Sequence, residues 1–263
     1  MSPIYVPGKV TLRQTWQPMD PDAAAYITAV EAADGLPLEE KVKIAIDNFV
    51  LGCKADGIWS AIKASCILAG ARTLAGALVP LVGTAPTNVG GLFVSGDYNR
   101  KTGMVGNGST KYLNSNRAVN ADLQNNKHLS IYTSTAINGT LLGSGQAASS
   151  FSSLETSGIY LASAASPRGS VPVGALGFIG ASRNEAASFT ARVQKASQIV
   201  AATSAAATAS VSYPVYAFSS VGGLISGYSN SRLAFYSIGE SLDLAKLDAR
   251  VTDLINAFEA AIP

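Results

Sequence analysis

The sequence predicts a mainly β protein, an antiparallel β-sandwich of the jelly-roll type with a helical hairpin before it and one helix after it. Short apolar runs, about ten of them, are separated by Gly, Asn, Ser and Pro between residues 65 and 239, as in sandwiches. Residues 20–55 and 241–262 instead repeat apolar side chains at steps of three and four. Of the 17 acidic residues, only Asp97, Asp122, Glu155 and Glu185 lie within residues 64–239.

Composition favours one large core whose surface is partly covered by a partner. The 263-residue chain is 48% hydrophobic and only 14% charged, whereas ordinary soluble domains carry about 25% charged residues. Residues 64–239 have a net charge of +7 and the flanks −5. The basic residues are spread singly, without a Lys/Arg cluster, so we do not expect nucleic-acid binding.

The first 16 residues predict an extended arm. Residues 4–16 contain a Pro-Gly turn and alternating apolar positions, so the arm is expected to pair with a sheet edge or a neighbouring subunit. No charged segment followed by an apolar one begins the chain, so we expect no secretory signal. The most apolar window, residues 67–82, is short and interrupted, so we expect no membrane span. The two cysteines, Cys53 and Cys66, fit buried free thiols in a protein made in a reducing cytoplasm.

Two helices are predicted before the sandwich, and with the arm they form an attachment segment over residues 1–63. Asp20-Pro21-Asp22 starts the first helix, which should end at Asp34-Gly35. The second follows Leu36-Pro37 and has an apolar stripe that runs to Cys53. A third, short helix is expected from Ile58 to about Lys63.

Residues 64–239 form the predicted sandwich. Two stretches in it, residues 129–154 and 196–231, carry no charged side chain. The Ala/Ser/Thr-rich part, residues 200–209, fits either a flexible loop or a segment packed against another copy of the protein.

A closing helix is predicted over residues 240–263. Ser241 and Asp243 supply N-terminal capping groups. Its narrow apolar stripe either packs on the body of the protein or surrounds an oligomer axis. The stripe consists of Leu244, Leu247, Val251, Leu254, Ile255 and Phe258, followed by Ile262.

The residue types argue against an enzyme. Glycoside hydrolysis normally needs two carboxylates beside the scissile bond, and the four acids of the sandwich are widely separated along the chain. The single histidine, His128, has no nucleophile motif near it and is expected to be structural. We predict no cofactor and no metal site. Calcium is conceivable at Asp97 with Asn99, or at Asp122 with Asn120 and Asn125, but these residues are more typical of turns.

A glycan or receptor contact is conceivable in the loop of residues 96–103. Tyr98 could stack on a sugar, while Asp97, Asn99 and Arg100 could hydrogen-bond to it. The alternative for this loop is an ordinary polar hairpin. A second candidate is the polar segment of residues 114–127.

Several segments together resemble a known class of protein. They are GIWSAIKAS (57–65), residues 81–90, residues 93–116 around SGDYNRKTG, HLSIYTST (128–135), FIGASR (178–183) and residues 228–243. In this order they resemble the concanavalin A-like, laminin-G-like sandwich modules of tailed-bacteriophage structural proteins, above all tail fibres. The resemblance covers roughly residues 20–262. It implies a two-sheet jelly roll without a cofactor, built into a virion and often oligomeric, and it carries over no catalytic residue.

We therefore expect a virion structural protein, first of all a tail fibre or tail-associated receptor-binding protein for host attachment. We expect a homo-oligomer, with a homotrimer as the leading possibility, in contact with other virion proteins and with host surface polysaccharide. The alternative is a capsid or tail cement protein that only stabilises the particle. A polysaccharide-degrading enzyme is the third and least favoured possibility.

Overall fold

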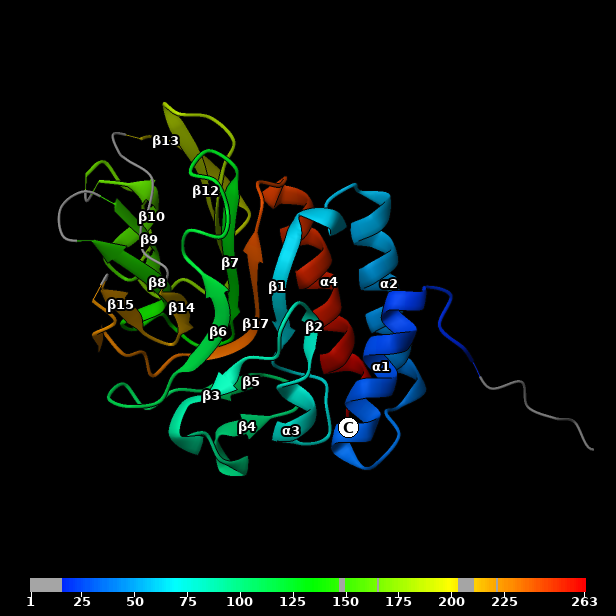
Figure 1. Ribbon diagram of the computed structural model, residues 1–263. Helices are drawn as coiled ribbons and strands as arrows, with labels where there is room; N and C mark the ends of the chain where they lie inside the picture. The colour runs from blue at the N-terminus through cyan, green and yellow to red at the C-terminus, as the bar shows by residue number, and fades with distance from the viewer. Residues whose placement is uncertain (1–15, 147–149, 165, 203–210, 221) are drawn as a thin grey trace, which may run out of the picture.

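The computed structural model describes residues 16–146, 150–164, 166–202, 211–220 and 222–263. Within them the chain forms three layers: a layer of helices, a nine-stranded sheet and an eight-stranded sheet (Figure 1). Residues 4–15 of the predicted arm and most of residues 200–209 lie outside the described residues, so those two predictions stay open.

The predicted helices form, and local capping groups define their ends. Helix α1 spans Pro21–Asp34; the Asp20 carboxylate accepts hydrogen bonds from two backbone N–H groups of its first turn, and Gly35 ends it with a φ of 68°. Helix α2 spans Glu40–Ala55. Helix α4 spans Leu244–Ala261, and the Asp243 side chain caps its N-terminus. Two more short helical segments are α3, Leu74–Ala77, and η1, Trp59–Ala61.

The nine-stranded sheet, called sheet A here, lies between the helices and the second sheet. Its strands follow the order β13-β12-β11-β7-β17-β1-β2, and β5 and β4 extend it beside β17. The bounds are Ala196–Ala201 (β13), Ser188–Val193 (β12), Gly177–Arg183 (β11), Lys127–Thr133 (β7), Arg232–Gly239 (β17), Ile62–Ile67 (β1), Pro80–Val82 (β2), Gly103–Val105 (β5) and Tyr98–Asn99 (β4).

The eight-stranded sheet, sheet B, forms the outer layer. Its main order is β10-β9-β8-β14-β6-β3, and β15 runs parallel to β8 and pairs with β16. The bounds are Gly158–Ser163 (β10), Ser150–Glu155 (β9), Thr140–Gln146 (β8), Ser212–Val215 (β14), Leu113–Ala118 (β6), Thr87–Asn88 (β3), Phe218–Ser220 (β15) and Ile225–Ser226 (β16). Together the two sheets confirm the predicted mainly β sandwich with helices at both ends of the chain.

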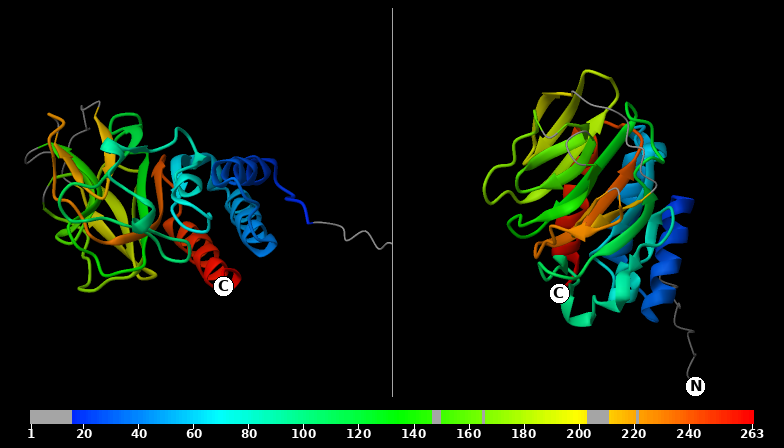
Figure 2. Two further views of the ribbon diagram at one scale, coloured as in Figure 1. Left: turned by 90° about the horizontal axis from the view of Figure 1, so that it is seen from below. Right: turned by 60° about the vertical axis from the view of Figure 1, so that its left-hand side comes forward.

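The central strands of sheet A are apolar on both faces because each face meets a different core. On β17, Phe235 faces the helices and Tyr236 faces sheet B, and both are fully buried. Alternate side chains therefore enter alternate cores, which is why this strand reads as an almost continuous apolar run. Figure 2 shows the helical layer against one side of the sandwich.

Two of the short apolar runs form less strand than their pattern predicts, because local turns replace it. In residues 77–83 only Pro80–Val82 pair with β1, and Thr73 caps the short helix α3 that precedes them. In residues 91–97 no strand forms. Gly90 and Gly91 instead have φ values of 64° and 65°, and the chain forms the 3₁₀ turns η2, Val89–Gly91, and η3, Ser95–Asp97.

The predicted short helix at residues 58–63 is also mostly wrong. It ends after one turn at Ala61, because Ile62 is already extended and pairs with Gly239. The predicted boundary at residue 64 therefore cuts through β1. The segment 114–127 was predicted to be a polar loop, yet its first five residues belong to β6, which pairs with β14 and β3.

Across the described residues, no helix is both long enough and apolar enough to cross a bilayer.

Candidate functional site

The loop of residues 96–103 was the first candidate for a glycan contact, and its side chains mostly hold the protein together. Asp97 accepts hydrogen bonds from the Val94 backbone N–H at 2.8 Å and from Lys111 Nζ at 2.5 Å. Burial alone would raise the pKa of Asp97, but these two hydrogen bonds outweigh burial and lower it. Asp97 is therefore an ionised partner of Lys111.

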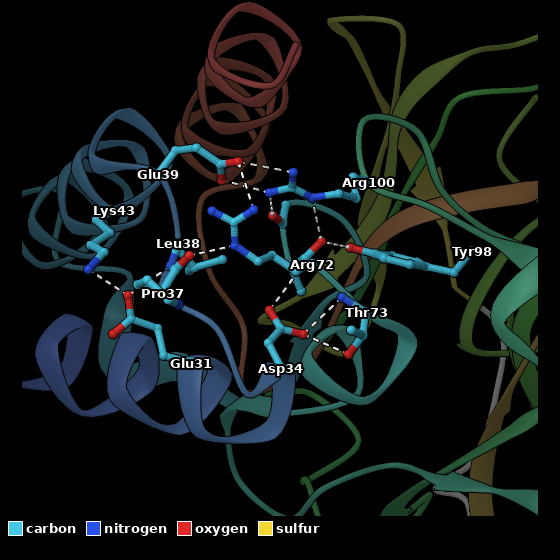
Figure 3. Close-up of polar contacts among 12 residues, drawn as sticks. Glu31, Asp34, Pro37, Leu38, Glu39, Lys43, Arg72, Thr73, Tyr98 and Arg100 are labelled. Carbon is cyan, nitrogen blue, oxygen red and sulfur yellow. Dashed lines mark hydrogen bonds and ion pairs between the residues drawn. The ribbon is translucent and has the colours of Figure 1, made fainter.

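Arg100 joins this loop to the start of helix α2. Its guanidinium contacts both carboxylate oxygens of Glu39, at 3.1 and 2.7 Å, and it donates to the backbone carbonyls of Gly70 and Ala71 (Figure 3). Arg72 adds a second cation 3.2 Å from Glu39. The hydrogen bonds from Arg100, followed by the charges of both arginines, lower the pKa of Glu39. Glu39 thus ties two segments of the sandwich to the helical layer.

Tyr98 points into the same junction. Its hydroxyl donates to the Ala71 carbonyl at 2.7 Å, and burial raises the pKa of its phenol. A ring held against the helical core in this way does not present a free face to a sugar. Asn99 is the exposed member of the set, and its side-chain oxygen accepts from the N–H groups of Lys101 and Thr102 within the turn.

Asp34, at the end of α1, completes the junction. Its carboxylate accepts from the backbone N–H groups of Arg72 and Thr73 at 2.7 and 2.8 Å and from the Thr73 hydroxyl at 2.7 Å (Figure 3). A side chain at Gly76 would lie 2.2 Å from Asp34 Oδ1, so the close approach requires glycine there. We call the set Asp34, Glu39, Arg72, Tyr98 and Arg100 the hairpin junction.

The second candidate segment, residues 114–127, is also engaged internally. Asn116 donates to the Ala85 carbonyl and to the Thr87 hydroxyl, which fixes β6 against β3. Arg117 forms a two-point ion pair with Asp122. Lys127 is buried, and its Nζ donates to the Val119 carbonyl at 3.1 Å.

The two conceivable calcium positions are used by cations of the chain itself. Asp97 pairs with Lys111, and Asp122 pairs with Arg117. No group of three or more His, Cys, Asp or Glu side chains suited to a metal occurs among the described residues. The other two acids of the sandwich accept hydrogen bonds from serines, Glu155 from Ser153 and Glu185 from Ser188.

His128 is fully buried on β7. Its Nδ1 donates to the Glu240 carbonyl, and its Nε2 accepts from the Ser237 hydroxyl, both at 2.6 Å. Both ring nitrogens of the neutral imidazole are thus satisfied. Burial lowers the pKa of His128 to about 4. The ring connects β7, β17 and the approach to α4, and this arrangement is structural.

The apolar stripe of α4 packs inside the molecule. Leu247, Val251 and Phe258 are fully buried in the core that the helices share with sheet A. Leu244, Leu254 and Ile255 belong to the same core and are 3%, 2% and 6% exposed. Of the two arrangements considered for this helix, the structure shows packing on the body.

A groove of about 500 Å³ lies between α1 and β2. Tyr26 and Trp59 line it together with Val79 and Val82, and Asp22 and Lys63 stand at its margins. Asp22 forms an ion pair with Lys54 and accepts a hydrogen bond from Trp59 Nε1, and Lys63 forms an ion pair with Glu240. The groove is mainly apolar and brings no convergent acid and base together.

Comparison with known proteins gives a limited result. No protein-family model and no curated protein matches the sequence. Among solved structures, the chain is similar to domain 4 of AbnA, a GH43 extracellular arabinanase from Geobacillus stearothermophilus, in complex with arabinotriose. The identity is 13%, the TM-score is 0.38, and the match covers 66% of this chain and 82% of that chain. At these values the similarity carries no argument about the site or its chemistry.

Proposed function

We propose that this protein is a structural component of a tailed-bacteriophage virion that binds other molecules without chemically changing them, most specifically a tail fibre or tail-associated host-recognition protein. The observation that carries the binding role is the state of the four acids in the sandwich. Asp97 and Asp122 are paired with cations, and Glu155 and Glu185 accept hydrogen bonds from serines. Each of these four carboxylates thus has a local partner in the described sandwich, which favours a structural role for them over the paired carboxylates that glycoside hydrolysis normally uses.

The virion assignment is supported by the resemblance of residues 57–65, 93–116 and 228–243 to phage structural modules. The three-layer fold accommodates all of these segments. Residues 57–65 run from η1 into β1 beside the helices, residues 93–116 include Tyr98 and Arg100 of the hairpin junction and part of β6, and residues 228–243 contain β17. These segments therefore contribute side chains to the contact between the helical layer and the sandwich.

Host contact then falls on the exposed loops between strands of the sandwich, away from Asp97, Tyr98 and Arg100. Those three side chains are committed to internal contacts, whereas several connections expose large apolar side chains. Leu123, Val173 and Leu224 are 76%, 106% and 72% exposed. Binding residues occur disproportionately on loops that a rigid scaffold holds in place.

Two measurements test the proposal. Antibody labelling of particles should place the protein at the tail, and the purified protein should bind host cells and compete with the phage for adsorption. Labelling over the head shell, with no binding to cells, would support the cement alternative. Release of reducing ends from host surface polysaccharide would show instead that the protein is an enzyme.

A further inference from the structure

The described sheets have six edge strands, and five of them are short or covered. β2 has three residues, one of them Pro80, which lacks an N–H group. β3, β4 and β16 have two residues each. At the edge of sheet B, β10 is covered because Ile159 and Gly169 exchange two backbone hydrogen bonds, at 3.0 and 2.9 Å. These devices prevent another chain from adding a strand.

The remaining edge strand, β13, lacks these protections. All six of its residues, Ala196–Ala201, pair with β12, and none carries a charge. The Ala202 N–H donates to the Ala187 carbonyl. Because hydrogen-bonded pairs alternate along an antiparallel ladder, every second residue before Ala202 directs its backbone groups toward β12. The N–H and C=O groups of Ser197, Ile199 and Ala201 consequently point away from β12. In the part of the chain that the structure describes, these groups have no backbone partner.

The face of β13 toward the helical layer is also uncovered. Ile199 is 74% exposed, whereas the next residue, Val200, is 5% exposed and enters the core between the sheets. The strand itself is held firmly. Gln198 exchanges two hydrogen bonds with the backbone of Ser170, and Arg192 on β12 bonds to both Ser197 and Asp248 of α4. An apolar side chain is thus displayed on a well-fixed edge at the far side of sheet A from β2 (Figure 1).

We propose that β13 pairs with β13 of a second copy, antiparallel, around a two-fold axis that passes beside Ile199. The outward-pointing residues are self-complementary about that centre. Ile199 meets Ile199 of the second copy, and on either side the small residues Ser197 and Ala201 face each other. All three outward N–H groups and carbonyls of each strand then have partners. A charged strand would repel its own copy, and this one carries no charge.

The pairing makes sheet A continuous across two copies and places both helical layers on the same face. It also explains why the first part of the stretch of residues 196–231 carries no charge. A two-fold contact produces an even-numbered assembly, in place of the trimer named as the leading possibility from the sequence. The inference stands without the virion assignment, because it rests on the edge and its side chains alone.

The first test is the mass of the full-length protein in solution over a rising concentration series, by sedimentation velocity. Wild type should approach the dimer mass, and Ile199→Lys should stay monomeric, because two lysines would meet at the axis. Leu224→Lys is the matched control: it also replaces an aliphatic side chain by lysine, at a site of nearly the same exposure, 72% against 74% for Ile199, and it should dimerise like wild type. Circular dichroism of each variant checks folding.

The second test traps the contact. Directly opposite residues of such a pair have Cα atoms about 5.5 Å apart, within disulfide range. Mild oxidation should therefore convert Ile199→Cys into a covalent dimer, while Leu224→Cys remains a monomer. The native thiols of Cys53 and Cys66 are buried and do not compete. A wild type that stays monomeric at every concentration, or a dimer that survives in Ile199→Lys, would overturn the proposal. So would a dimer lost only on deletion of residues 1–15, since the arm would then be the contact.

Discussion

His128 and Lys127 are adjacent on β7, and burial lowers the pKa of both side chains. For His128 the folded value is about 4 against an ordinary 6.5. Between pH 6.5 and pH 4 the His128 imidazole is therefore protonated in the unfolded chain but neutral in the folded chain. The free energy of unfolding consequently falls as the pH drops from 6.5 to 4. The full effect is roughly 3 kcal/mol. His128→Gln should remove this part of the acid sensitivity, as measured by urea unfolding across that pH range.

The comparison that isolates His128 is the difference between the two unfolding curves, because carboxylates elsewhere titrate equally in both proteins. We expect that difference to change by about 2 to 3 kcal/mol between pH 6.5 and pH 4. A difference that is constant over that range would show that His128 becomes protonated inside the folded protein.

Lys127 predicts an effect in alkali. Burial lowers its pKa to about 8, from an ordinary 10.5, so the folded chain loses this proton before the unfolded chain does. Stability should consequently rise between pH 8 and 10.5. Lys127→Met should be more stable than wild type at pH 7, by about 1 to 3 kcal/mol, because it removes a charge that is hard to bury. Thermal unfolding of wild type at pH 8 and pH 10.5 tests the rise in stability, and thermal unfolding of both proteins at pH 7 tests the Met variant. A Met variant less stable than wild type at pH 7 would show that the hydrogen bond to the Val119 carbonyl contributes more than the burial of the charge costs.

At the scale of elements, the hairpin junction should respond to the loss of one charge. Glu39→Gln keeps the shape of the side chain but weakens its bonds to Arg100 and Arg72. Because Glu39 is only 27% exposed, we expect a loss of about 1 to 3 kcal/mol in the free energy of unfolding. Glu40→Gln is the matched control, since Glu40 is the exposed neighbour. Equal effects of the two substitutions would mean that the junction adds nothing specific.

Helix α4 gives a second test at this scale. Leu254 is 2% exposed in the core shared with sheet A, so Leu254→Asp buries a charge and should cost at least about 4 kcal/mol. Asn256→Asp introduces the same group two residues away on the exposed face and should change stability by less than about 0.5 kcal/mol. Soluble expression and chemical unfolding separate the two. A folded, stable Leu254→Asp protein would mean that α4 is not part of the core.

The elements that the sequence predicts well are those defined by neighbouring residues. Asp20 with Pro21, Gly35 and Asp243 mark helix ends through bonds made within a few positions. β6 escapes prediction because its polar side chains resemble a loop, and only pairing with β14 and β3 makes it a strand.

The candidate site was harder to predict for the same physical reason. Arg100 and Glu39 are 61 positions apart, and no spacing rule connects them. The residue types of a polar loop are the same whether they meet a sugar or a helix. Only the fold shows that Tyr98 and Arg100 face the helical layer. The uncharged stretch that begins at Ala196 was the one sequence signal that pointed toward the open edge at β13.

At the scale of the whole molecule, the helical layer and the sandwich share one core. Phe235 of β17 and Phe49 of α2 stack edge to face with ring centroids 5.8 Å apart, and Phe178 of β11 lies in the same cluster. The hairpin junction adds ion pairs between the same two parts. Neither part buries its apolar surface without the other, so we predict that both unfold in a single transition.

The distribution of tryptophan makes this prediction measurable. Both tryptophans, Trp16 and Trp59, pack against the helical core, so their fluorescence reports on the helical layer. Hydrogen exchange of β8, β9 and β14 reports on sheet B, whose described buried apolar residues on these strands belong to the core between the two sheets. In urea, tryptophan fluorescence and the exchange of these strands should give the same midpoint. Glu39→Gln should move both midpoints together, because a junction inside one cooperative unit stabilises the whole unit. If fluorescence changed at lower urea while sheet B stayed protected, the helices would be a separately unfolding unit.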